Sequence, residues 1–238
     1  MKRFVKLISL VLALTAICLC VASCGGPTGK AKYDTSLTGE GTEVRMSMVN
    51  KEIDAYKVSD FVASEQESDF VLIKVKNYGE IVVALRSDIA PTTVKNFKKL
   101  VSGKFYDGTV FHRVIENFMI QGGGYVYVGD DLTQKRSDNI KGEFTSNGVT
   151  NNLTHVRGVI SMARVATDND SASSQFFIVH NTTSSTRNLN GDYATFGYVL
   201  AGMEVVDAIA VCECEGDSQA PKPVEPVVIE SITFVEPK

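Results

Sequence analysis

The sequence predicts a mainly β protein in which a closed β-barrel is plugged at its ends by two α-helices. Residues 70–235 contain many short apolar runs of strand length, separated by Gly, Asn and Asp turn signals. Residues 91–102 and 203–210 have the apolar spacing of helices instead. Many short strands with two helices are typical of a barrel. One domain, residues 70–236, accounts for all of these elements.

The first elements of this domain are predicted to be a β-hairpin and a helix. Residues 70–76 and 80–86 are apolar runs on either side of an Asn-Tyr-Gly turn. Pro91 lies near the first position of the helix, where a missing N–H costs little, and Gly103 can end it. The apolar positions at helical spacing, which we expect to face the core, are Val94, Phe97, Leu100 and Val101.

Residues 105–123, FYDGTVFHRVIENFMIQGG, are predicted to form two short strands joined by a tight turn. Because side chains alternate along a strand, we expect Phe111, Arg113 and Ile115 to share one face. An arginine between an aromatic and an aliphatic residue is unusual for a plain core. The pattern raises the question of whether Arg113 has a functional role or forms a structural ion pair.

The remainder of the domain is predicted to alternate turns with short strands. Residues 125–142 are expected to be a long polar connection. Val205, Val206 and Ile209 give the second helix its apolar face. The further strands are predicted at residues 159–163, 175–179, 195–199 and 227–235.

The N-terminus has the three-part pattern of an export signal. Three basic residues among the first six precede an apolar run over residues 7–21, which is short for a membrane-spanning helix. The following VASCG resembles the bacterial lipobox, in which the cysteine, here Cys24, is acylated and becomes the new N-terminus. We predict that residues 1–23 are a signal peptide and that Cys24 anchors the protein to an extracytoplasmic bacterial membrane surface. The alternative is an ordinary signal peptide with an incidental cysteine.

Residues 24–69 are predicted to be a tether and a lead-in to the domain. Residues 25–45 are rich in Gly, Thr, Ser and Lys without apolar periodicity, as in a flexible linker. Residues 46–68 fit a short helix or a strand equally well.

The charge balance disfavours two kinds of partner. The chain has 24 basic and 28 acidic residues, and loss of the signal peptide removes three basic residues and no acidic one. The mature chain thus has a net charge of about −7, which disfavours nucleic acid or anionic headgroups as partners of the folded part.

Cys212 and Cys214 form a C-x-C pair near the C-terminus. A metal site would need further ligands nearby, and no histidine accompanies the pair, so no metal site is predicted. A disulfide across one residue is geometrically strained. We interpret the pair as incidental or weakly redox-active.

Residues 106–123 resemble the signature of cyclophilin-type peptidyl-prolyl isomerases. The resemblance implies an eight-stranded antiparallel barrel, capped by two helices, with a groove on its outer surface. It spans about residues 70–235 in several ordered blocks. The other blocks that resemble the family are residues 81–100, 158–164, 171–178 and 189–197.

The resemblance also implies the site residues of an isomerase. Arg113, Phe118 and Gln121 are implied to be catalytic. The implied substrate-binding residues, which stand at groove positions of the family, are Met119, Ala163, Arg164, Gln175, Phe177, Leu189 and Tyr193.

The chemistry of the predicted reaction fits these residue types. Rotation about a peptide bond has a barrier of about 18–20 kcal/mol, and the cis and trans forms before proline are close in energy. A catalyst therefore needs no nucleophile, cofactor or metal, but must bind the twisted amide better than the planar forms. Arg113 can donate to the prolyl nitrogen of the twisted amide, and Gln121 can orient it. The three histidines, His112, His155 and His180, are assigned structural roles.

Three positions depart from the family pattern. Asn188 stands where well-studied members often have an aromatic residue that contacts cyclosporin, so weak cyclosporin binding is expected. Tyr193 replaces a histidine found in many members, and Ser173 stands where a glycine is common.

Two other functions compete with the predicted enzyme, whose substrates would be proline-containing exported polypeptides. A non-catalytic chaperone or scaffold module could hold the same proline segments without turning them over. A solute-binding lipoprotein would fit the lipobox and tether, but such proteins usually need two lobes around a cleft, and the length fits this poorly.

Overall fold

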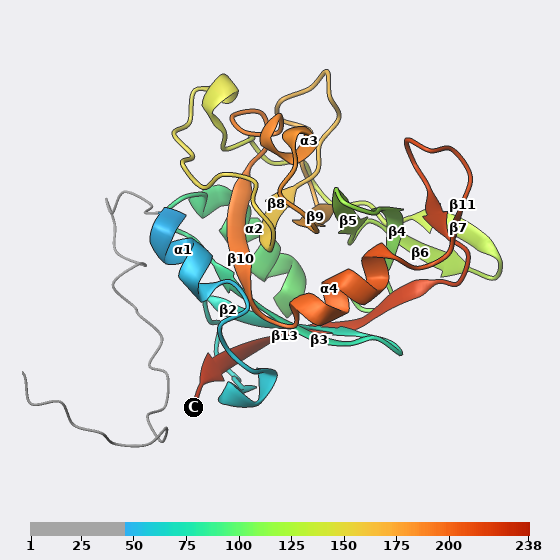
Figure 1. Ribbon diagram of the computed structural model, residues 1–238, viewed down its shortest axis with the longest axis horizontal. Helices are drawn as coiled ribbons and strands as arrows, with labels where there is room; N and C mark the ends of the chain where they lie inside the picture. Colours follow the sequence, from blue (N-terminus) through green and yellow to red (C-terminus); the bar gives the residue numbers. More distant parts are fainter. Residues whose placement is uncertain (1–45) are drawn as a thin grey trace, which may run out of the picture. The chain divides into compact units, whose positions relative to one another are not determined.

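The computed structural model describes residues 46–238 (Figure 1). The predicted signal peptide, Cys24 and the tether up to residue 45 lie outside the described residues. Within the described part, no helix is long and apolar enough to cross a membrane.

Eight antiparallel strands close into a ring, as predicted. Their order is β13–β2–β3–β10–β8–β9–β5–β4, and β4 pairs with β13 to complete the circle. The ring strands are β2 (Phe70–Val75), β3 (Gly79–Leu85), β4 (Val110–Ile115), β5 (Met119–Gly122), β8 (Val159–Met162), β9 (Phe176–Val179), β10 (Thr195–Ala201) and β13 (Val227–Pro237).

Closure of the barrel depends on the length of β13, the long strand in red in Figure 1. Its first residues, Val227 and Val228, pair with β4. Its later residues, from Ile229 to Val235, pair with β2. A strand of 11 residues is long enough to join both partners, so the ring has no free edge between β2 and β4.

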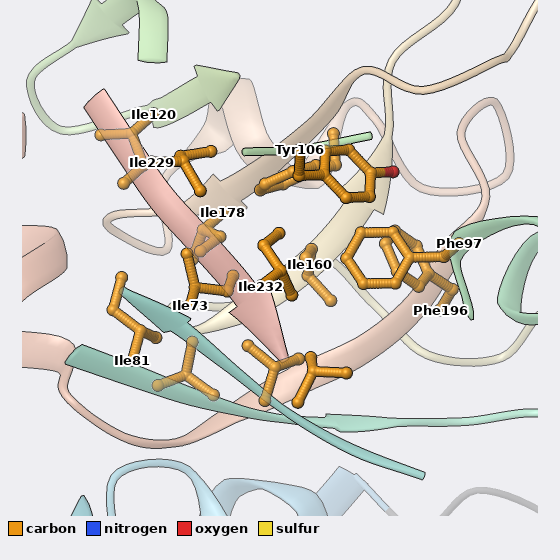
Figure 2. Packing of buried hydrophobic residues seen from close by; sticks show 14 of the residues in the cluster. Ile73, Ile81, Phe97, Tyr106, Ile120, Ile160, Ile178, Phe196, Ile229 and Ile232 are labelled. Atoms are coloured by element: carbon orange, nitrogen blue, oxygen red, sulfur yellow. The ribbon is translucent and has the colours of Figure 1, made fainter. Parts of the chain in front are cut away.

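The interior of the barrel is an apolar core filled by inward side chains from the strands. Ile120, Ile160 and Ile178 come from the neighbouring strands β5, β8 and β9 and meet inside the ring (Figure 2). Phe97 enters the same core from α2 (Pro91–Ser102), with its ring centroid 5.0 Å from Tyr106 and 5.2 Å from Phe196.

The two predicted capping helices are present. The α2 helix starts at Pro91 and stops before Gly103, while α4 spans Met203–Ala210. Both bury their apolar faces in the core of the barrel. Gly202, with φ of +95°, precedes α4, and a Cβ there would lie 2.3 Å from the Glu80 carbonyl oxygen, so only glycine fits.

A buried carboxylate caps α2. Ala90 precedes the helix and offers no side-chain cap. Instead, Glu143 accepts hydrogen bonds from the backbone N–H groups of Thr92 and Thr93, at 2.9 and 2.7 Å, and from the Thr93 hydroxyl at 2.8 Å. A negative charge at this end of the helix also matches the direction of the helix dipole.

The lead-in is folded from Met46 onwards. It forms α1 (Met46–Glu52), the 3₁₀ turn η2 (Val58–Asp60) and β1 (Phe61–Ala63), which pairs with β13. Val49 of α1 is fully buried in a cluster with Tyr198 and Leu200 on the outer face of β10. The predicted domain start at residue 70 marks the first ring strand, but the packed unit includes this earlier segment.

Residues 125–142 differ from the predicted polar connection. They contain a hairpin of β6 (Tyr125–Val128) and β7 (Asp131–Gln134), since the alternating Tyr and Val of β6 form a strand despite the polar surroundings. The remaining short elements are η3 (Thr145–Asn147), α3 (Ser184–Arg187), β11 (Cys214–Glu215) and β12 (Lys222–Pro223).

The C-x-C pair consists of two free thiols. The sulfur atoms of Cys212 and Cys214 lie 3.8 Å apart and are partly buried. Burial raises the pKa of Cys212 to about 12, with the neighbouring Cys214 adding to the effect. A thiol with so high a pKa is a poor nucleophile at neutral pH.

Replacing Glu143 should destabilise the fold. Glu143→Ala removes a buried charged acceptor and leaves two N–H groups of α2 without their partner, so we expect the free energy of unfolding to fall by about 3 kcal/mol. Urea unfolding measures this change. Glu67→Ala is the matched control, because its carboxylate is 60% exposed beside Lys98 and should contribute under about 1 kcal/mol. Equal effects of the two variants would contradict the capping role.

Candidate active site

The outer surface of the barrel carries a second apolar cluster, which the lead-in leaves uncovered. Met119, Phe177 and Val179 are buried at its base, on the strands β5 and β9. Partly exposed side chains surround them and make the walls of a groove. These are Ile115, Phe118, Ala163, Leu189 and Tyr193.

A β-bulge in β4 turns Arg113 towards this groove. Phe111 pairs with Gly122 and Arg113 pairs with Gln121, so two steps along β4 match one step along β5. Phe111 and Val114 both lie in the barrel core, whereas Arg113 faces outwards. The prediction that Phe111 and Arg113 share a face is therefore wrong, because the extra residue changes the alternation.

Gly122 makes room for the bulge. A Cβ at this position would lie 2.9 Å from the Phe111 ring and 3.0 Å from the Val110 carbonyl oxygen. Any larger residue would push β4 away from β5 at the bulge. Gly122, the first glycine of the QGG sequence, thus helps to set the direction of Arg113.

Arg113, Gln121 and Phe177 form one row across three strands. Arg113 is the pairing partner of Gln121, and Gln121 is the pairing partner of Phe177. Paired residues on one face of an antiparallel sheet have side chains in contact. The row therefore puts a charged donor, a polar amide and an aromatic side chain next to one another.

The guanidinium of Arg113 is held on two sides. Its Nη1 donates to Gln121 Oε1 at 3.1 Å, with Met119 Sδ at 3.5 Å. Its Nε donates to the backbone carbonyl of Gln219 at 2.8 Å. Among the described residues, Nη2 has no hydrogen-bond partner, which leaves this donor for a bound molecule. Burial lowers the pKa of Arg113, but arginine stays charged in proteins.

The Gln219 contact is a part of the site that sequence reasoning missed. Gln219 lies 106 residues after Arg113, in the loop between β11 and β12. Its contribution is a backbone carbonyl, so no side-chain type marks it in the sequence. The bond from Val114 N–H to the Pro221 carbonyl, 3.0 Å long, fixes the loop against β4.

A cavity of about 260 Å³ lies beside Arg113. The structure brings nine of the ten predicted site residues to its lining. They are Arg113, Phe118, Met119, Gln121, Ala163, Arg164, Phe177, Leu189 and Tyr193.

Gln175 lies just outside this cavity. It lines an adjoining hollow of about 510 Å³ that shares Gln121, Ala163 and Arg164 with the first. Its Oε1 accepts from Gln121 Nε2 at 3.1 Å, so it holds the amide that orients Arg113. Gln175 thus supports the site through Gln121.

The arginine also contacts the aromatic wall of the cavity. Arg113 Cζ lies 5.9 Å from the centre of the Phe118 ring, close enough for a cation–π interaction. Phe177 and Tyr193, which also line the cavity, meet edge to face with ring centroids 6.0 Å apart. The cavity therefore combines aromatic side chains with the cationic donor Arg113.

Arg164, at the edge of the cavity, packs against two aromatic side chains. Its guanidinium carbon lies 4.9 Å from the centre of the Tyr193 ring and 5.0 Å from that of Phe144. Its Nε donates to the Asp192 carbonyl at 2.8 Å. Arg164 therefore fixes Tyr193 through stacking and a bond to the preceding residue.

Behind Phe177 lies a buried histidine. The rings of His155 and Phe177 are stacked with centroids 5.8 Å apart. His155 Nδ1 donates to Asn190 Oδ1 at 2.9 Å, so Nε2 accepts from the Ser161 hydroxyl at 3.0 Å. Burial lowers the pKa of His155 to about 4, which keeps the ring neutral at pH 7. The structural role assigned to His155 matches these contacts.

Comparison with known proteins places these features in one family. Residues 70–234 match the family model for cyclophilin type peptidyl-prolyl cis-trans isomerase/CLD. The chain is 40% identical over 161 residues to peptidyl-prolyl cis-trans isomerase A of Dickeya dadantii, covering 66% of this chain and 80% of that protein. It is 38% identical over 167 residues to peptidyl-prolyl cis-trans isomerase B of Escherichia coli, covering 67% and 96%.

A solved structure has the same architecture. It is a cyclophilin type peptidyl-prolyl cis-trans isomerase of Cryptosporidium parvum, crystallised in the presence of the dipeptide Ala-Pro. The TM-score is 0.55 at 29% sequence identity, covering 69% of this chain and 98% of that one.

Barrel, groove and oriented arginine together define a protein of cyclophilin-like architecture. The chain belongs to the family of cyclophilin-type peptidyl-prolyl cis-trans isomerases, since the match spans residues 70–234 and the relatives are enzymes of that class. The family predicted from the sequence blocks is confirmed.

The stability of the site should depend on pH through His155. Its pKa is about 4 when folded and about 6.5 when unfolded, so the unfolded state binds more protons as the pH falls below 6.5. We expect His155 to contribute a loss of about 2 kcal/mol in the free energy of unfolding between pH 7 and pH 5.

Urea unfolding of the parent and of His155→Gln at both pH values isolates this contribution. The variant should start from a lower stability at pH 7 but lose about 2 kcal/mol less on acidification. His112, whose pKa burial also lowers to about 4, is present in both proteins and cancels in the difference. An identical pH dependence of the two proteins would contradict a neutral buried His155.

Proposed function

We propose that this chain is a peptidyl-prolyl cis–trans isomerase that acts on proline-containing segments of exported polypeptides. The family of the chain supports the reaction. The observation that carries the proposal is a cationic donor, Arg113, held at the edge of a cavity of about 260 Å³ whose lining includes Phe118, Met119, Phe177 and Leu189. The related Cryptosporidium parvum protein was crystallised with Ala-Pro, which supports a proline-containing substrate here.

The reaction requires that a planar amide become twisted. The barrier of about 18–20 kcal/mol reflects the loss of amide resonance. In the twisted state the prolyl nitrogen regains a lone pair, so a donor aimed at it stabilises that state more than the planar one. Arg113 can supply this donor from Nη2, because Nε and Nη1 are bound to Gln219 and Gln121.

The apolar side chains of the cavity would hold the pyrrolidine ring while the preceding part of the peptide rotates. Met119 and Phe177 form the base of the cavity, Phe118 lies beside Arg113, and Leu189 and Tyr193 also line it. These side chains stabilise the bound ring by excluding water from it. The charged group is fixed before the substrate arrives, so little reorganisation is needed during rotation.

We further propose that the enzyme works at an extracytoplasmic membrane surface, held there by lipid on Cys24. The support is the sequence pattern of an export signal over residues 1–23 and the lipobox-like VASCG sequence. Clients would be newly exported chains whose folding waits on proline isomerisation, a step of tens of seconds without a catalyst. Weak cyclosporin binding, expected from Asn188, is part of the same proposal.

Replacing Arg113 should remove most of the activity. In Arg113→Ala the twisted amide loses its donor, and we expect kcat/KM on a prolyl peptide to fall by about 100-fold or more. A protease-coupled peptide assay on the full chain measures this. Arg187→Ala is the matched control, since Arg187 is exposed on α3 and does not line the cavity.

The same pair of variants separates the enzyme from a proline-binding chaperone or scaffold. An enzyme should lose both peptide turnover and the acceleration of client refolding when Arg113 is replaced. A scaffold would handle refolding clients equally well in Arg113→Ala. A parent chain without measurable acceleration of the peptide would refute the proposed function.

Metabolic labelling with a palmitate analogue tests the anchor. We expect the label to enter the parent chain and the protein to fractionate with membranes. Cys24→Ser should lose both the label and the membrane association. Labelling that persists in Cys24→Ser would contradict Cys24 as the lipid attachment site.

A further inference from the structure

The turn between β4 and β5 places Phe118 in the lining of the cavity beside Arg113. Phe118 follows Asn117, whose φ of +60° lies in the left-handed region, a conformation that asparagine tolerates better than most residues. The Phe118 N–H donates to the Ile115 carbonyl at 3.1 Å and closes the turn. The position of the Phe118 ring therefore depends on how firmly this exposed turn is held.

His180, at the end of β9, holds the turn at two points. Its backbone N–H donates to the Phe118 carbonyl at 3.0 Å. Its side-chain Nδ1 accepts from the Asn117 N–H, also at 3.0 Å. The two bonds fix the backbone on both sides of the peptide unit that joins Asn117 to Phe118.

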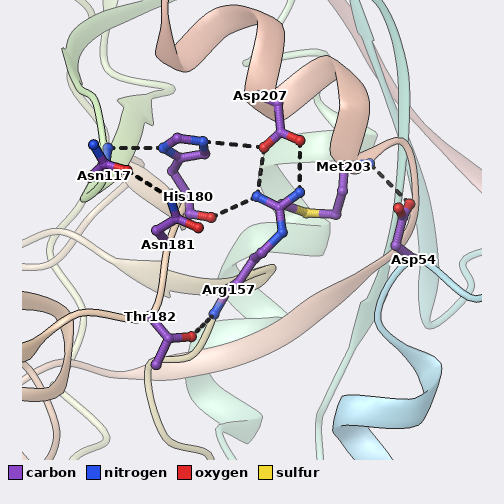
Figure 3. Close-up of polar contacts among 8 residues, drawn as sticks. All are labelled: Asp54, Asn117, Arg157, His180, Asn181, Thr182, Met203 and Asp207. Carbon is purple, nitrogen blue, oxygen red and sulfur yellow. Dashed lines mark hydrogen bonds and ion pairs between the residues drawn. The ribbon is translucent and has the colours of Figure 1, made fainter.

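The other ring nitrogen of His180 faces Asp207 of α4. Because Nδ1 accepts, the proton of the neutral ring is on Nε2, which lies 3.2 Å from Asp207 Oδ1. His180 is 93% buried, so its ring has little freedom to turn away from these partners. Figure 3 shows the ring between Asn117 and Asp207.

Arg157 fixes the aspartate in turn. Its guanidinium binds both oxygens of Asp207, at 2.6 and 2.7 Å, and donates to the His180 carbonyl at 2.8 Å. The hydrogen bond from Arg157 lowers the pKa of Asp207, which keeps the carboxylate charged. A chain of contacts thus runs from α4 through His180 to the wall of the cavity (Figure 3).

We propose that His180 is a positioning residue for the isomerase site, which it serves by accepting the Asn117 N–H and so holding Phe118 against Arg113. The inference rests on the proposed isomerase function. His180 does not line the cavity, and its effect passes through the turn. The distance that it would maintain is the 5.9 Å between Arg113 Cζ and the Phe118 ring centre.

Three substitutions distinguish the two sides of the imidazole. His180→Asn puts an amide oxygen at the δ position, where it can still accept from Asn117. His180→Gln puts its amide at the ε position, where it can still donate to Asp207 but leaves the Asn117 N–H without an acceptor. His180→Ala removes both contacts, and all three variants keep the backbone bond to Phe118.

We expect kcat/KM on a prolyl peptide to stay within about twofold of the parent in His180→Asn. In the Gln and Ala variants kcat/KM should fall by about fivefold or more. The loss of one hydrogen bond changes the equilibrium between the held and the released turn by roughly tenfold. The proposal is overturned if the kcat/KM of the Asn variant does not exceed that of the Gln and Ala variants. Three variants with equal activity, or a Gln variant more active than the Asn variant, would be such results. Thermal unfolding of each variant identifies a loss that comes only from misfolding.

Amide hydrogen exchange by NMR on the full chain gives a readout that does not need activity. The Asn117 amide should be protected in the parent and in His180→Asn and exposed to exchange in the other two variants. The Phe118 ring resonances should shift in those two variants alone. If the parent shows no isomerase activity, the proposed function fails while this exchange pattern still tests the contact. Equal protection of Asn117 in all four proteins would overturn the proposal.

Discussion

One extra residue in β4 lets this barrel present a charged side chain on its outer surface. The bulge between Phe111 and Arg113 lets Phe111 and Val114 both fill the core while Arg113 points outwards. Without it, strict alternation would keep Arg113 on the same side as Phe111, in the apolar interior. Gly122 permits the bulge because a side chain there would strike the Phe111 ring. A local break in pairing thus puts the permanent charge where a substrate can reach it.

The outer face of the barrel is divided between stability and function. Around β10 the apolar side chains are covered by α1 and β1 of the lead-in. Around β5 and β9 they stay open and form the groove. The open part is supported from behind by neutral His155 under Phe177 and, on our inference, by His180 beside Phe118. Rigid support is expected where catalysis relies on a donor that is already in place.

Local pattern was enough to predict most of the fold but only part of the site. Strand and helix periodicity predicted the ring strands and the limits of α4, because those signals are local. The bulge depends on pairing with Gly122, and the packing of Val49 depends on Tyr198, so neither leaves a local signal. The site residues were predicted from the resemblance to cyclophilin-type isomerases. The Gln219 carbonyl stayed hidden because a backbone group has no residue type.

The central claim is that Arg113 stabilises the twisted amide more than either planar form. NMR exchange spectroscopy on a prolyl peptide bound to the full chain measures affinity and the rate of cis–trans exchange in the same sample. In Arg113→Ala we predict that Kd changes by less than about threefold while the exchange rate of the bound peptide falls by about 100-fold. A weaker affinity with an unchanged exchange rate on the bound peptide would contradict the account, because Arg113 would then contribute only to binding.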